Sequence, residues 1–249
     1  MKKMKYTILL PLIAVVCGAV GLGLRVLLYA NGMDEKGMLV WNHPLDIATW
    51  VIALAVIALF VVVLRRQTES CEYRDQFPAS IDAAIVTFAA AIGCLVLAFQ
   101  IRGEDMDTLT TLWFRLAILA AASFSVTAWF RLKGTRPLFV FHAVICLFFC
   151  IHTVCQYRMW SSNPQVADYG FAVLACVSLV LTALYRAAFD VDMARPRKLR
   201  FMSLLAVFFC ILSLVGPQFR IFYVFGGVWA ISNILPPFVR PREADEKEV

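Results

Sequence analysis

Six polar side chains in or beside long apolar segments are the strongest candidates for ligand binding in this sequence. They lie near the predicted external ends of those segments, and they are Arg25, Asp46, Arg115, His152, Gln156 and Asp168. Charged residues inside a membrane are costly, so they are functional suspects by default. Because arginine forks bind carboxylates and phosphates, the set predicts an outward-facing vestibule for a small anionic or zwitterionic ligand. The alternative, which we favour, is a set of interfacial caps and ion pairs that fix helix packing.

A second chemical pattern is a column of possible metal ligands. His142, Cys146 and Cys150 recur every four residues, which places an imidazole and two thiols along one face of a helix. Such soft ligands suit Cu(I) or Zn. Ligands stacked on a single helix cannot close a tetrahedral site, and the sequence offers no second His/Cys pair at ligand spacing. We therefore expect no bound metal and no other cofactor.

Motifs of known catalytic mechanisms are missing from the sequence. It contains no glycine-rich phosphate loop, no HExxH and no GxSxG. The middle of each apolar segment also lacks Asp, Glu, Lys and Arg, which disfavours a proton relay through a bilayer. An interfacial enzyme that acts on lipid head groups through His43, Asp46 and His152 stays open as a third interpretation.

The elements that must position these residues are membrane-spanning helices. Hydrophobic residues make up 61% of the 249 positions and charged residues only 16%, and the mean hydropathy is +0.78. A helix needs roughly 20 apolar residues to cross a hydrocarbon core of about 30 Å. The sequence therefore predicts an all-α, polytopic transmembrane helix bundle that forms a single domain over residues 1–249. Its eight predicted spans are 6–29, 45–64, 81–101, 109–130, 137–156, 168–188, 199–216 and 221–239.

Positive charge predicts the orientation of this bundle, because cytoplasmic loops retain Lys and Arg. With the N-terminus inside, most of the 23 Lys and Arg residues fall in cytoplasmic segments. Both termini are therefore predicted to be cytoplasmic, and residues 240–249 to form a disordered cytoplasmic tail. The short connection 216–220 leaves a seven-span alternative open. The similar starts of the second and sixth spans leave open a parallel internal repeat of four spans.

Charge and cysteine usage narrow the partners and the compartment. The net charge of +6 is spread over short loops, without the basic face that a nucleic-acid partner requires. The eight cysteines fall in predicted spans or, for Cys71, in a predicted cytoplasmic loop. A disulfide framework is therefore not expected, because disulfides form in oxidising compartments.

Several short motifs carry a resemblance to a known group of proteins. They are Asp34-Glu35-Lys36-Gly37-Met38, Phe77-Pro78-Ala79-Ser80, Trp160-Ser161-Ser162-Asn163-Pro164-Gln165 and Asp168-Tyr169. With them the chain resembles multi-pass membrane proteins of anaerobic Gram-positive bacteria that have no assigned activity. The resemblance implies a bacterial plasma membrane and no catalytic residue.

The function expected from these observations is that of a non-enzymatic membrane component, such as a scaffold, a sensor or an accessory subunit. Polar groups cluster at the ends of the predicted spans, and the loops are too short to hold a catalytic domain. The alternative is a small-solute permease that uses the external Arg/Asp vestibule. The expected partners are the lipid bilayer and a further membrane protein, and the sequence does not identify a small-molecule ligand.

Overall fold

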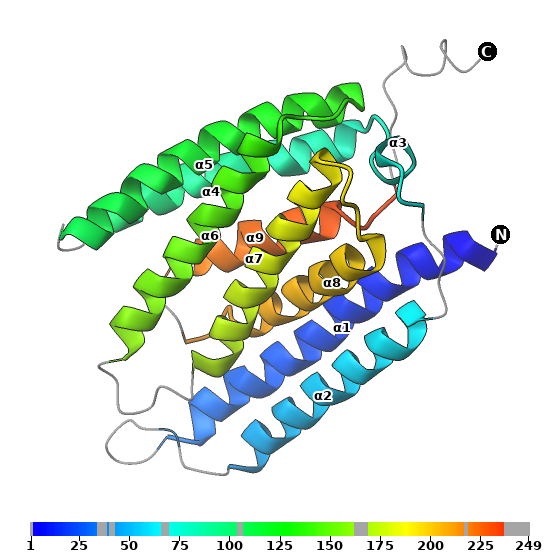
Figure 1. Ribbon diagram of the computed structural model, residues 1–249. Helices are drawn as coiled ribbons and strands as arrows, with labels where there is room; N and C mark the ends of the chain where they lie inside the picture. Colours follow the sequence, from blue (N-terminus) through cyan, green and yellow to red (C-terminus); the bar gives the residue numbers. More distant parts are fainter. Residues whose placement is uncertain are drawn as a thin grey trace.

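The computed structural model of the chain is a bundle of helices (Figure 1). It describes residues 2–33, 39, 43–65, 70–103, 107–161, 169–216 and 219–236, and for residues 2–7 the backbone alone. Of the described residues, 83% lie in helices and none in a named strand. The predicted all-α class is therefore confirmed.

The helices begin and end close to where the apolar runs predict. Their bounds are α1 Lys2–Asn31, α2 Pro44–Arg65, α3 Tyr73–Gln76, α4 Ile81–Ile101, α5 Thr108–Lys133, α6 Phe139–Trp160, α7 Gly170–Asp190, α8 Pro196–Leu212 and α9 Arg220–Ser232. Only the single-turn helix α3 was not predicted. Six of the helices, namely α1, α2 and α4 to α7, are long and apolar enough to cross a membrane.

Capping groups explain several of these boundaries. Ser80 Oγ accepts a hydrogen bond from the Ala83 amide at 3.1 Å and starts α4. Asp107 Oδ1 accepts one from the Thr110 amide at 2.8 Å and starts α5, and Ser and Asp are both favoured N-cap residues. Ahead of α2, His43 Nδ1 accepts a hydrogen bond from the Leu45 amide. Gly134 ends α5 with φ +63°, a left-handed conformation that favours glycine.

The last two helices are shorter than predicted. The predicted span 199–216 ends at Leu212, and the predicted span 221–239 ends at Ser232. Asn233 closes α9, since its side-chain amide donates to the Trp229 carbonyl at 3.0 Å. At 1.5 Å per residue, α8 is about 25 Å long and α9 about 20 Å long. Both are shorter than a hydrocarbon core of about 30 Å, and neither counts among the six long apolar helices.

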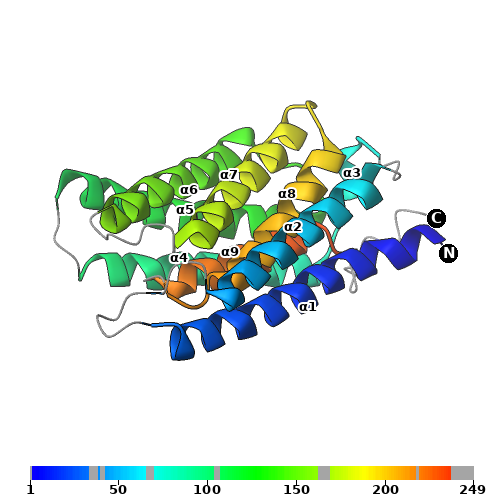
Figure 2. The same ribbon diagram turned by 90° about the horizontal axis from the view of Figure 1, so that it is seen from below.

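Of these two short helices, α8 occupies the interior of the bundle, whereas α9 is buried on one face and exposes Val224 and Val228 on the other. Helix α8 packs against α1, α2, α7 and α9, and α9 also packs against α4. Figures 1 and 2 show the α1–α2 pair and the α4–α5 pair on opposite sides, with α8 and α9 between them. The seven residues from Leu204 to Cys210 are all buried, as expected for a helix surrounded by others. The predicted tail 240–249 lies outside the described residues.

Aromatic rings fill the middle of the bundle. Phe149, near the midpoint of α6, contacts Phe222 and Trp229 of α9 with centroid separations of 5.6 Å each. Phe124 of α5 contacts Trp229 at the same separation. Large apolar side chains such as Phe99 of α4 are instead exposed on the outside, where a bilayer would cover them.

Candidate functional site

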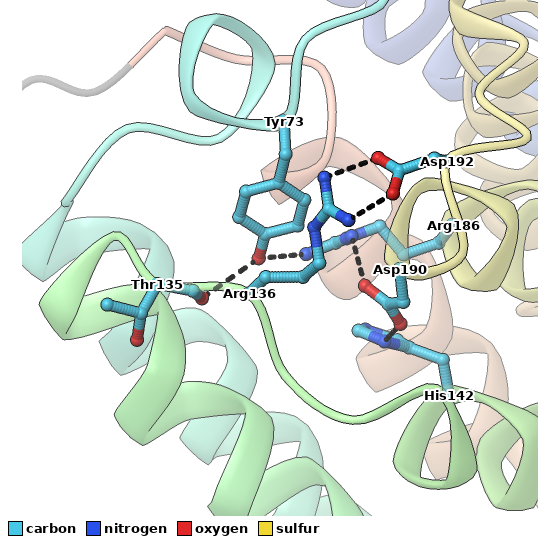
Figure 3. A network of polar contacts seen from close by, with 7 residues as sticks. All are labelled: Tyr73, Thr135, Arg136, His142, Arg186, Asp190 and Asp192. Carbon is cyan, nitrogen blue, oxygen red and sulfur yellow. Dashed lines mark hydrogen bonds and ion pairs between the residues drawn. The ribbon is translucent and has the colours of Figure 1, made fainter.

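A buried polar network lies at the end of the bundle that carries α3, residues 134–138, residues 191–195 and residues 233–236, which we call the α3 end. Figure 3 shows its members converging from α3, α6 and α7. Asp190 is its centre. The Asp190 Oδ2 atom lies 2.6 Å from His142 Nδ1, and Oδ1 lies 3.4 Å from Arg186 Nη1. Arg186 Nη2 in turn donates to the hydroxyl of Tyr73 at 2.9 Å.

The charged members of this network are withdrawn from solvent. Arg186 is 1% exposed, Asp190 9% and His142 3%. The Arg186 guanidinium lies over the ring of Phe77, 3.7 Å from its centroid, and Phe77 packs edge-on against Phe189. Tyr73 reaches a loop as well, because its hydroxyl donates to the Thr135 carbonyl at 3.2 Å. The Asp190 carboxylate thus joins α6 to α7. The Arg186 guanidinium beside it holds α3 against these two helices.

An exposed ion pair stands next to this buried network (Figure 3). Arg136 and Asp192 form two hydrogen bonds, of 2.8 and 2.6 Å. Asp192 lies in the turn after α7 with φ +59°, a conformation that Asp tolerates better than most residues. The hydrogen bond from Arg136 lowers the pKa of Asp192, and the same bond raises the pKa of Arg136.

At the opposite end of the bundle, Arg25 occupies an aromatic pocket. Its guanidinium lies 5.0 Å from the centroid of Phe171, and its Nη2 atom donates to the hydroxyl of Tyr29 at 3.4 Å. Asp46, which is half-buried, lies within electrostatic range of Arg25. Arg25 itself is buried, with 4% of its surface exposed.

His152 and Gln156 lie in a different part of the same half, between α5, α6 and α9. His152 is fully buried and stacks on Phe222 with a centroid separation of 3.5 Å, and Trp113 meets it edge-on at 5.2 Å. Four buried atoms here have no hydrogen-bond partner within the described part of the chain. They are Trp113 Nε1, His152 Nδ1, His152 Nε2 and Gln156 Oε1. Such a cluster is a place for bound water or a small polar solute.

The six predicted vestibule residues do not form one site. Arg25 with Asp46 and His152 with Gln156 make two separate clusters in different helix pairs. Arg115 is exposed on α5, where its long side chain can reach the interface, and no contact joins it to either cluster within the described part of the chain. Asp168 lies outside the described residues. His43 caps α2, apart from the buried ring of His152.

Two members of the column of possible metal ligands contact α7. His142 Nδ1 pairs with Asp190, and the Cys146 thiol lies 3.7 Å from the Val180 carbonyl of α7. Across the described ranges, no group of three or more His, Cys, Asp or Glu side chains is placed to hold a metal ion. All eight cysteines are unpaired.

The buried network itself was missed by sequence reasoning. Arg186 and Arg131 count among the cytoplasmic charges that predict the orientation, and Asp190 lies beyond the predicted end of its span at 188. The four-residue spacing of Arg186 and Asp190 is a signal that was available, because such pairs face each other on a helix.

Comparison with known proteins adds nothing to this geometry, since no family model, curated protein or solved structure matches the chain.

Proposed function

We propose that the chain is an integral protein of a bacterial plasma membrane that acts as a non-enzymatic component, such as a scaffold, a sensor or an accessory subunit, and does not carry solutes. The observation that carries the proposal is the closed middle of the bundle. Phe124, Phe149, Phe222 and Trp229 interlock there, whereas the buried charged groups lie towards the two ends. A carrier needs a polar binding site that is accessible from alternate sides near the midplane.

We also propose that all eight long and short apolar helices lie in the membrane, with both termini in the cytoplasm. The basic residues at the ends of α2, α5 and α7 and at the start of α8 all belong to the α3 end, and they include Arg65, Lys133, Arg136, Arg186 and Lys198. This bias supports a cytoplasmic α3 end. The short helix α8 can be accommodated because other helices surround it and shield it from lipid, whereas α9 exposes the apolar side chains of Val224 and Val228, which lipid can cover.

Solute flux through reconstituted protein tests the proposal. Proteoliposomes are mixed with hyperosmotic glycine or glycerol, and their re-swelling is followed by light scattering. We expect the re-swelling rate to equal that of protein-free vesicles, because the aromatic layer blocks passage. A rate that rises with protein content would contradict the proposal.

The second candidate function is a small-solute permease, which the unpartnered atoms of Trp113, His152 and Gln156 favour. If the chain is a permease that uses this cluster, His152→Phe abolishes the flux of glycine or glycerol. Tyr157→Phe is the matched control, because Tyr157 lies on the same helix with its side chain exposed. Flux that responds to His152 and not to Tyr157 would replace the first proposal by the second.

A further inference from the structure

A cavity of about 200 Å³ opens at the α3 end, beside the buried network. The linker between α3 and α4, the end of α5, helix α8 and the residues after α9 enclose it. Its polar lining residues are Asp75, Gln76, Ser80, Arg131, Arg200 and Asn233. The cavity lies apart from the aromatic middle of the bundle, so a ligand could bind there whether or not the chain carries solutes.

Arg131 is the buried cation of this cavity. The residue is 7% exposed, its Nη2 atom donates to the Ser232 carbonyl at 3.2 Å, and its guanidinium lies 4.9 Å from the centroid of Phe77. Its Nη1 atom is buried and has no hydrogen-bond partner among the described residues. A buried guanidinium with an unused donor is costly, and a bound anion would remove that cost.

The charges around Arg131 add to its preference for an anion. Arg186 lies against the same Phe77 ring, and Arg200 lines the cavity, so three cations gather in one region. Two carboxylates oppose them. Asp82 lies within electrostatic range of Arg131 and accepts a hydrogen bond from Ser80, and Asp75 is exposed at the cavity and accepts one from Ser70.

The helix ends at the cavity also favour binding of an anion. Ser80 lines the cavity as the N-cap of the 21-residue helix α4, so the positive end of that helix dipole faces the cavity. The carbonyl end of α9 also meets the cavity, but its last carbonyls are already used. The carbonyl of Trp229 accepts from Asn233, that of Ser232 from Arg131, and that of Ile231 from the Ile234 and Leu235 amides.

We propose that this cavity binds a phosphate group, with the guanidinium groups of Arg131 and Arg200 donating to its oxygens. Paired guanidinium forks at a helix N-terminus match the charge and the spread of a phosphate oxyanion. The phosphate belongs either to an anionic lipid head group that reaches the bundle end or to a soluble phosphomonoester. The chemistry of recognition is the same for both sources.

Binding to the purified full-length protein in neutral detergent tests this inference. The probes are glycerol 3-phosphate in one arm and phosphatidylglycerol, compared with phosphatidylcholine, in the other, at constant ionic strength. Titration calorimetry and native mass spectrometry measure affinity and stoichiometry. We expect one bound phosphate group per chain and about tenfold weaker binding by Arg131→Gln, because the charge-assisted contact from Arg131 Nη1 is lost.

Matched variants keep the test informative. Lys133→Gln removes one positive charge from the same end of α5, where Lys133 is exposed and stacks on Trp129, and it is expected to leave binding unchanged. Arg200→Gln is used alongside Arg131→Gln, because Arg131 also holds Ser232 and its loss can impair folding. Binding of the lipid alone assigns a lipid head group, and binding of glycerol 3-phosphate assigns a soluble ligand. Absence of one-to-one binding of either probe, or equal weakening by Lys133→Gln and by the two Arg variants, would overturn the inference.

Discussion

Asp190 is the residue on which the buried network depends, because both of its carboxylate oxygens are used. One oxygen faces His142 and the other faces Arg186, and all three residues are buried. Removing one partner of a buried pair leaves an uncompensated charge, which costs about 3–5 kcal/mol. The stability of the α3 end should therefore respond strongly to this single side chain.

The substitution Asp190→Asn is expected to lower the free energy of unfolding by about 3 kcal/mol or more, because Arg186 then stays buried without its counter-charge. Equilibrium unfolding in mixed micelles measures the change. Asp192→Asn is the control, since it breaks the neighbouring pair with Arg136 where both side chains reach solvent, and its effect should be small. Similar losses for the two variants would show that the buried network contributes nothing special.

Because of Asp107, the stability of the bundle end opposite the α3 end should decrease at acidic pH. It caps α5, and hydrogen bonds from Thr110 and then from Arg158 lower its pKa from 3.8 to about 2. A carboxyl group whose pKa is lower in the folded state than in the unfolded state stabilises the fold at every pH above its unfolded-state pKa. This contribution is lost as the pH falls towards 2. The advantage of wild type over Asp107→Asn should therefore be constant near neutral pH and shrink between pH 3.8 and about 2. Unfolding measured across this range checks it, and a pH-independent difference would be inconsistent with the capping role.

Close approach of α4 and α9 depends on a single glycine. A Cβ atom at Gly93 would lie 2.6 Å from the Phe225 ring, whereas a Cβ at Gly23 of α1 would meet nothing within 4 Å. Gly93→Ala should therefore destabilise the protein by about 1–3 kcal/mol, because α9 must move in a packed core. Gly23→Ala should be neutral or slightly stabilising, since alanine favours helix. Thermal unfolding of both variants in the same detergent tests this, and equal melting temperatures would count against the close packing.

The helices were largely predictable, and the reason is physical. Apolar length is a local signal, so the predicted spans 81–101 and 109–130 match α4 and α5 closely, and the capping residues Ser80 and Asp107 lie directly before them in the sequence. The ends of α8 and α9 were missed because hydropathy alone does not distinguish a buried short helix from a spanning one. The site was less accessible to prediction, because His142 and Asp190 are 48 residues apart and only the packing of α6 on α7 brings them together.

The molecule as a whole is asymmetric from end to end. The α3 end holds the buried network, the phosphate cavity and most of the described basic residues. The opposite half holds the Arg25–Asp46 cluster and the His152 cage, and aromatic rings separate the two halves. If the α3 end lies in the cytoplasm, its cavity faces the inner leaflet and the cytosolic pool of phosphates.

Labelling of one cysteine at each end by a membrane-impermeant maleimide tests this orientation most directly. Cys71 is exposed at the α3 end, and Gly103 is exposed at the opposite end of α4, so Gly103→Cys in a Cys71→Ser background gives the matched probe. In intact cells we expect labelling of Gly103→Cys and none of Cys71 until the membrane is permeabilised. Labelling of Cys71 in intact cells, with Gly103→Cys protected, would contradict the membrane placement proposed for the whole bundle.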